Sequence, residues 1–457
     1  MTGNVIAGSQ SPWMRSLGGS SRGNAGKPSG KKPSGNASDA GRLFFPQSQA
    51  LGIGPEDTVS PAVLQKMVYA GTNASSFKQA SEDLLHEAEL TISAQRIMRA
   101  TKRIGGERTA QRDAEIQAWE QLPLPEQQRS PRTQVPAVAV AEMDGGRMQI
   151  RERKVAEEEA APKEDRSGYW RETKVGCLLT VASEISSEDP CPTIPQVFVD
   201  PRRMRKMVRE IKGFCAEEDK ESSREEAAAE PRKGQPVVLV RSVVATRQDV
   251  HALGRQLAAA AWQRGFAAAP RKAFVGDGQE ANWTVHRTQF SQYVPILDFI
   301  HGLCYVYAGA LAGRRLREGW PVYLQWAQWV WSGEVEKAIE ALKIRLQEFG
   351  PAQDNESEES PRQKVADALR YLQNQKPRMR YDEYRRQGLP LTSSHIESTI
   401  KQINHRVKGS EKFWSNLGAE ALLQLAADHI SETKPLTTFW RERPARATGQ
   451  RSYQTTS

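Results

Sequence analysis

The sequence has few cysteines and no long apolar run. Its four cysteines among 457 residues form no CxxC pair and lack the spacing of a zinc finger: Cys177, Cys191, Cys215 and Cys304. The longest apolar stretches, such as 257–262 and 303–312, fall well short of the roughly 18–20 residues that a membrane-spanning helix needs. These absences argue against a disulfide framework, a zinc finger and a membrane partner.

The beginning of the sequence lacks the apolar core of a secretion signal, and we therefore expect a cytoplasmic protein. Positive charge is in modest excess, with 64 Lys and Arg against 55 Asp and Glu. Residues 1–57 and 433–457 are expected to be basic tails, the first disordered, that attract phosphates without regard to sequence. A solvated surface would show the same modest surplus. The length suffices for two or three domains.

Three helices are predicted within residues 58–125, the last running from Ser93 to Ile104 before the glycine pair Gly105-Gly106. Three short helices in succession favour a helix-turn-helix DNA-binding domain. The third helix projects four basic side chains outward as candidate DNA contacts: Arg96, Arg99, Lys102 and Arg103. An ordinary solvated helix shows the same pattern.

After a proline-rich joint at 122–136, the apolar period changes from 3.6 to 2, which indicates strands. The segment Asp144-Gly145-Gly146 is typical of a hairpin turn. A helix near 248–264 between two strands implies a parallel pair of strands. Strands are predicted at 135–143, 148–153, 174–182, 237–244, 272–275 and 294–297, which gives an α/β fold with a mixed sheet and flanking helices.

The predicted core spans 130–312 and is interrupted by acidic, low-complexity insertions at about 156–168 and 183–235. An all-helical insertion follows at 313–390, and the last core helices lie in 391–432. The tryptophans crowded between Trp320 and Trp331 favour core packing over a ligand site.

Three acids occupy comparable positions far apart in the sequence. Asp144 follows the first strand and Asp277 the fourth, while Glu397 lies in the first turn of a late helix. In an RNase-H-like sheet, the first and fourth strands are neighbours with aligned carboxyl ends, and a helix packs its first turn against that edge. Clustered carboxylates repel one another unless cations join them, so we expect a site for two Mg²⁺ ions about 3.5–4 Å apart.

The sequence resembles the DDE transposases of bacterial insertion sequences, in the broad group akin to Mutator transposases. The resemblance runs from about residue 60 to the end, and it is carried by MDGGRMQIR (143–151), VGDGQ (275–279), ILDFIH (296–301) and SSHIESTIKQINHRVKGSEKFWS (393–415). It implies an RNase-H-like core with Asp144, Asp277 and Glu397 as catalytic metal ligands. Asp298 and His301 match the family's Asp/Cys-x-x-His motif, which implies a catalytic role for His301 and an auxiliary one for Asp298.

The resemblance implies a transposase that binds the ends of its element and performs Mg²⁺-dependent cleavage and strand transfer on DNA, with Mn²⁺ as a possible substitute. The implied partners are double-stranded DNA, namely the terminal repeats and the target, and a second copy of the chain. It also implies a nucleoid-associated protein in a bacterial host. On the late helix, Lys401, Asn404 and Lys408 share a face with Glu397 and are further candidate DNA contacts.

Other interpretations stay open. The chain can be a DNA-binding protein with an inactive RNase-H-like domain. A tyrosine recombinase is poorly supported, because Tyr453 and His405-Arg406 do not supply the residue set that it needs. Asp298 can be a helix cap with His301 buried behind it. The spacing between Asp144 and Asp277 is also unusually long for the resembling family.

Overall fold

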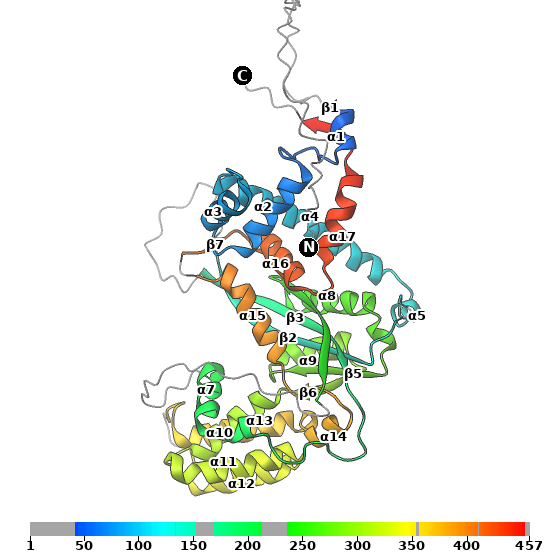
Figure 1. The fold of residues 1–457 in the computed structure, drawn as a ribbon. Helices are drawn as coiled ribbons and strands as arrows, with labels where there is room; N and C mark the ends of the chain where they lie inside the picture. The colour runs from blue at the N-terminus through cyan, green and yellow to red at the C-terminus, as the bar shows by residue number, and fades with distance from the viewer. Residues whose placement is uncertain are drawn as a thin grey trace, which may run out of the picture.

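A computed structural model of the chain describes residues 42–132, 134–151, 169–212, 235–352, 356–409 and 411–452. A central sheet separates an upper group of helices from a lower one (Figure 1). The predicted insertion at 156–168 and the residues Cys215 and Tyr453 lie outside the described residues.

The central sheet has the strand order β4-β3-β2-β5-β6, with the short β7 added to β2. β3 is antiparallel to β2 and β4, whereas β5 is parallel to β2 and β6. This arrangement confirms the predicted α/β class with a mixed sheet. The strands are β2 (Val138–Ile150), β3 (Trp170–Ala182), β4 (Val237–Thr246), β5 (Arg271–Gly276), β6 (Val294–Leu297) and β7 (Phe413–Trp414).

Helices connect and cover these strands. α8 (Val250–Gln263) joins β4 to β5 through the short η3 (Phe266–Ala268), and α9 (Glu280–Gln289) joins β5 to β6. Late in the chain, α15 (Ser394–Val407) packs on β2 and β3, and α16 (Asn416–Ile430) packs on β4. The apolar faces of these helices and the sheet share one hydrophobic core.

The predicted hairpin at Asp144-Gly145-Gly146 is wrong. β2 runs straight through these residues, and Gly145 and Gly146 pair with Lys174 and Thr173 of β3. Neither glycine has the positive φ that a two-residue hairpin needs. A Cβ on Gly146 would lie only 2.8 Å from the Thr173 hydroxyl, so the residue serves close strand packing.

The helices predicted before the sheet are present as α2 (Pro61–Asn73), α3 (Phe77–Ala88) and α4 (Ala94–Glu120), followed by the short α5 (Leu124–Gln127). Serine side chains cap the first three. The predicted end of the third helix at Gly105-Gly106 is wrong, since α4 continues through both residues. A Cβ at Gly105 would lie 2.5 Å from the Ala421 carbonyl oxygen, so this glycine allows α4 to approach α16 closely.

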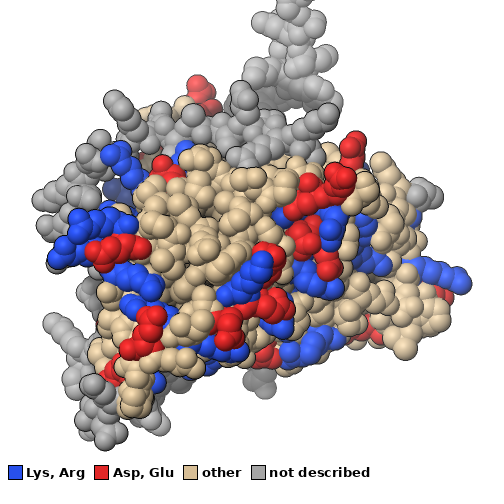
Figure 2. Space-filling model, turned by 90° about the horizontal axis from the view of Figure 1, so that it is seen from below, with Lys and Arg blue, Asp and Glu red and all other residues tan. Residues whose placement is uncertain are grey.

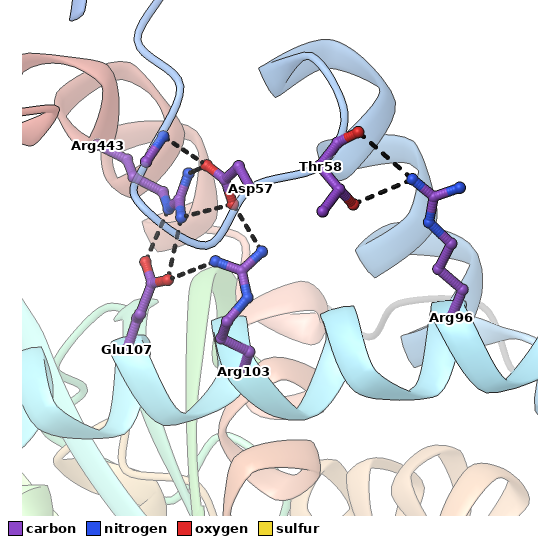
Figure 3. A network of polar contacts seen from close by, with 7 residues as sticks. Asp57, Thr58, Arg96, Arg103, Glu107 and Arg443 are labelled. Carbon is purple, nitrogen blue, oxygen red and sulfur yellow. Dashed lines mark hydrogen bonds and ion pairs between the residues drawn. The ribbon is translucent and has the colours of Figure 1, made fainter. Parts of the chain in front are cut away.

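The two predicted basic tails are partly folded. β1 (Arg42–Phe44) pairs antiparallel with β8 (Gln450–Ser452), and α1 (Pro46–Ala50), α17 (Pro435–Glu442) and η5 (Arg443–Arg446) lie beside them. Asp57 accepts hydrogen bonds from Arg103 of α4 and Arg443, and Arg443 also contacts Glu107 (Figure 3). This network fixes residues 42–57 and 433–452 to the body, which composition alone did not indicate.

Residues 183–212, predicted as part of an acidic insertion, contain α6 (Gln196–Val199) and α7 (Pro201–Lys212). Phe198, Met204 and Val208 are buried in the main core, and α7 packs on α10 (Phe299–Leu311). The prediction failed because the apolar residues of this segment are sparse, although they recur at helical spacing. The rest of that predicted insertion, 213–234, is not described.

Between residues 313 and 390, every regular element in the described part is helical. Trp326 and Trp331 are buried in the core, as expected, and no described helix is both long enough and apolar enough to cross a bilayer. Cys177 and Cys304 are buried and Cys191 is partly exposed. The helices are α11 (Leu316–Trp331), α12 (Val335–Glu348), α13 (Pro361–Gln375), η4 (Lys376–Arg378) and α14 (Tyr381–Arg386).

Candidate functional site

Asp144 and Asp277 lie at the same level of two neighbouring parallel strands. The pairing of β2 with β5 ends where Glu142 faces Val275. Asp144 and Asp277 each follow two residues later, so the register brings two residues that are 133 positions apart in the sequence to one edge of the sheet. Both side chains are half-buried.

Glu397 reaches this edge from the first turn of α15. The Ile396 backbone N–H donates a hydrogen bond to Glu142 Oε2 at 3.1 Å, which fixes the start of the helix against β2. Thr399, one turn further, is buried beside Cys177 of β3, with 3.3 Å between its hydroxyl and the sulfur. The helix therefore presents Glu397 at the place where β2 passes the end of β5.

The three acids influence one another electrostatically. Burial, together with the charges of Asp277 and Glu397, raises the pKa of Asp144 to about 6. Burial and the charge of Asp298 raise the pKa of Glu397. Within the described residues, none of the three acids forms an ion pair with a lysine or an arginine. The cluster therefore carries negative charge that the described side chains compensate only in part.

The Asp277 side chain is held in place by neutral groups. Oδ1 accepts from the Gln279 backbone N–H at 3.0 Å and from Asn282 Nδ2 at 2.6 Å, while Oδ2 accepts from Gln279 Nε2 at 2.8 Å. The Tyr371 hydroxyl of α13 donates to the Asp277 carbonyl oxygen at 2.7 Å. These bonds orient the carboxylate and cancel none of its charge.

Asp298 is the N-cap of α10 and is completely buried. It accepts hydrogen bonds from the His301 backbone N–H at 3.0 Å and from the Ser393 N–H and hydroxyl, both at 2.5 Å. Burial opposes ionisation of Asp298, but bonds from His301 and Ser393 outweigh it and lower its pKa. One carboxylate thus ties α10 to the start of α15.

His301 lies beside the acids and is partly exposed, so it is not a core histidine. Its Nδ1 lies 3.4 Å from Asp298 Oδ1. Burial disfavours the charged ring, but Asp298, Asp277 and Glu397 outweigh that effect and raise the pKa of His301 to about 9. The histidine is therefore protonated at neutral pH, and its charge lowers the pKa of Asp144.

A fourth acid, Glu142, was missed from the sequence. It is fully buried two residues before Asp144, and its Oε1 has no hydrogen-bond partner in the described part of the chain. Burial, with the charges of Asp298 and Glu397, raises the pKa of Glu142 to about 8. The available indication was an acid within the otherwise apolar string VAVAEM (138–143).

The chemistry of these donors suits Mg²⁺ or Mn²⁺, which prefer carboxylate oxygens. A bound cation stabilises clustered carboxylates most when they are partly buried and have no basic partner. Across the described ranges, however, no three His, Cys, Asp or Glu side chains are grouped as in a formed metal site. The residue types fit these ions, but the described side chains are not arranged as a complete coordination site.

The predicted DNA contacts on α4 divide into two kinds. Arg103 is an ion-pair partner of Asp57 at 2.6 Å and of Glu107 at 3.3 Å, so its predicted role in DNA contact does not match its place in the fold (Figure 3). Arg96 is exposed and donates to the Thr58 hydroxyl at 3.0 Å. Arg99 is exposed, and Lys102 lies partly buried against α16.

The candidates on α15 lie along its outer face. Lys401 and Lys408 are exposed, and Asn404 is partly exposed near Gly146. Lys401 Nζ lies 3.7 Å from Glu210 of α7, and Lys408 lies over the Trp170 ring. The outer face of α15 therefore carries two exposed lysines, Lys401 and Lys408, on the C-terminal side of Glu397.

A scan against models of known protein families and a search of curated proteins both found no match.

Proposed function

We propose that the chain is a DNA transposase of the DDE type, in which Asp144, Asp277 and Glu397 bind two divalent cations and cleave and join DNA strands. One observation carries this proposal. The acids are 133 and 120 residues apart in the sequence, yet the pKa of Asp144 is raised by burial and by the charges of Asp277 and Glu397, and no described Lys or Arg forms an ion pair with any of the three.

The topology supports an RNase-H-like assignment of the core. Three antiparallel strands are followed by two parallel ones, and the first and fourth strands of the core, β2 and β5, are neighbours. The late helix α15 packs on β2 and β3, after a segment in which the described elements are all helical. These are the features that the resemblance to insertion-sequence transposases implies.

Each residue has a distinct role in the proposed chemistry. Asp144 would share both ions, Asp277 one and Glu397 the other, and bound ions supply activation of a water or 3′-hydroxyl and stabilisation of the leaving oxygen. Asn282 and Gln279 orient the Asp277 carboxylate toward the site. Protonated His301 offers a positive charge to a phosphate oxygen, and Asp298 keeps the ring in place.

The N-terminal helices would recognise the element ends in this proposal. Arg96 and Arg99 of α4 are exposed and available to phosphates or bases. Arg406 of α15 donates to the Gly71 carbonyl oxygen of α2 at 2.9 Å and lies over the Phe77 ring. DNA held on the helices would therefore be held at a fixed position relative to Glu397. Two ends require at least a dimer on DNA, and such a protein acts at the bacterial nucleoid.

A DNA-binding protein with an inactive core is the second candidate. The observation in its favour is that no formed metal site occurs in the described residues. Both candidates bind DNA, and only the first cleaves it.

The test uses labelled duplexes from the two flanks of the coding sequence, incubated with the full chain and Mg²⁺. The variants Asp144→Asn, Asp277→Asn and Glu397→Gln should each lower cleavage by about 10³-fold, since a metal ligand contributes several kcal/mol to the transition state. Glu340→Gln, which removes an exposed charge on α12, is the matched control and should cleave normally. Cleavage that persists in Asp144→Asn contradicts the proposal, and binding without cleavage by the wild type favours the inactive core.

A further inference from the structure

Helix α7 is the most basic helix near the site. Its twelve residues contain six Lys or Arg and a single acid, Glu210. Met204 and Val208 are buried, whereas Arg202 and Arg209 are exposed on the opposite face. Lys206 lies on the same exposed face, because positions i, i+4 and i+7 share one side of a helix.

This helix stands next to the carboxylate site. Figure 1 shows α7 below α15 and above α10 on one flank of the molecule. Glu210 of α7 reaches Lys401 of α15 at 3.7 Å, and its charge contributes to the raised pKa of Glu397. This contact places α7, with its exposed arginines, next to α15 and Glu397.

The basic residues of α7 differ from those on the lower helices. Figure 2 views the molecule from the side of α11 and α12, where acidic and basic side chains are interspersed. On α12, Lys337 pairs with Glu334 and Lys343 with Glu340. Within the described residues, by contrast, neither Arg202 nor Arg209 forms an ion pair with an acid. The lower face is internally neutralised, whereas Arg202 and Arg209 leave their charge available to a partner.

The partner must be a polyanion that needs no apolar contact. A basic amphipathic helix can also bind an anionic membrane, but it then buries its apolar face in lipid. The apolar face of α7 is already occupied by α10. At 1.5 Å per residue, twelve residues extend about 18 Å, a length over which a DNA duplex presents about ten phosphates.

We propose that the exposed arginines of α7, Arg202 and Arg209, bind the phosphate backbone of DNA beside the carboxylate site. This inference rests on the proposed function and specifies which surface guides the DNA strand to Glu397. Binding here is independent of base sequence, because phosphates are the same at every step. It adds to any recognition by the N-terminal helices.

The test compares Arg202→Gln/Arg209→Gln with Arg317→Gln/Lys343→Gln, a control with the same change in charge on α11 and α12. Affinity for a random-sequence duplex is measured against salt concentration. Each lost phosphate contact lowers the slope of log K against log salt by about 1, so the α7 variant should lose about 2. The control should match the wild type.

A second variant separates charge from folding. Arg202→Lys/Arg209→Lys keeps the positive charge and should keep the salt dependence of the wild type. If the wild type binds DNA and the α7 variant retains its slope, this inference is wrong and the proposed function stands. If the wild type binds no DNA, both are wrong. Binding to anionic vesicles that depends on α7, with DNA binding unchanged, also overturns the inference.

Discussion

Two groups of buried acids in this molecule have opposite electrostatic surroundings. Asp57, which is 1% exposed, contacts Arg443 at 2.8 Å and Arg103 at 2.6 Å. Burial works against its ionisation, but these partners outweigh burial and lower the pKa of Asp57. Asp144 has no such described partner, and its pKa rises to about 6. The first group is compensated within the fold, whereas ionisation of Asp144 is opposed by its surroundings.

Arginine also compensates the charge of a partly buried acid elsewhere in the fold. Asp189, before α6, accepts a hydrogen bond from Arg385 Nε of α14 at 2.7 Å. Its pKa is lowered as well, because the bonds from Arg385 outweigh partial burial. The site edge departs from this pattern, since Asp277 is held by amides and Asp144 by a backbone N–H. Asp57 and Asp189 are thus paired with arginines, whereas Asp144 and Asp277 are held by neutral groups.

The largest loss of stability should come from removing an arginine that is paired with Asp57. Arg443→Ala removes one of the arginine partners of buried Asp57 and should lower the free energy of unfolding by about 3–5 kcal/mol. Arg446→Ala is the control, because its pair with Glu442 is exposed and worth about 1 kcal/mol or less. Urea unfolding of both variants measures the difference. Equal losses would show that the Asp57 network does not hold the chain ends.

The contact between α4 and α16, which supports the compensated region, should be sensitive at one glycine and tolerant at the next. Gly105→Ala forces a Cβ against Ala421 and should destabilise by about 1–3 kcal/mol. Gly106→Ala meets nothing within 4 Å and should stabilise by up to about 1 kcal/mol through helix propensity. Thermal unfolding compares the pair. A gain in both variants is incompatible with close packing at Gly105.

Removing one uncompensated charge should stabilise the metal-free protein. Because the pKa of Asp144 rises from 3.8 to about 6 on folding, the folded state binds protons more tightly, and stability falls as pH rises from about 4 to about 6. Asp144→Asn should therefore gain about 1 kcal/mol above pH 6, after allowance for partial exposure, and nothing below about pH 4. Unfolding across this pH range checks it, with Glu340→Gln as the control. A gain that is independent of pH would contradict the explanation.

The smallest predicted change concerns His301. Its pKa of about 9 implies that the ring contributes stability below pH 6.5 that is lost as pH rises through about 9. NMR titration of the ring should give a midpoint near 9 in the wild type. Asp298→Asn removes the main attraction and should lower that midpoint. An unchanged midpoint would mean that Asp298 does not hold the imidazolium.

Local patterns in the sequence predicted the elements well. The period-2 strings became β2 and β3. The β-α-β order before Asp277 placed β4 and β5 in one sheet, but β5 pairs with β2 and not with β4. Helix starts followed serine caps such as Ser93. Each of these features depends on residues close together in the chain, which is why the sequence carried them.

The failures all depend on partners far along the chain. Gly105 and Gly146 resembled a helix end and a turn, because the side chains that crowd them, at Ala421 and Thr173, are remote in sequence. The partner of Asp57 at Arg443 lies 386 residues away, so the chain ends were expected to be tails. Whether an arginine lies beside Asp144 likewise depends on tertiary packing, which local sequence patterns do not reveal.

The most direct test of the uncompensated site is a calorimetric titration of Mg²⁺, and then Mn²⁺, into the metal-free protein. The account predicts saturable uptake of about two ions per chain by the wild type and by Glu340→Gln. Asp144→Asn, which removes the shared ligand, should lose that uptake while remaining folded. Absence of saturable binding in the wild type, or identical binding by Asp144→Asn, would contradict the account.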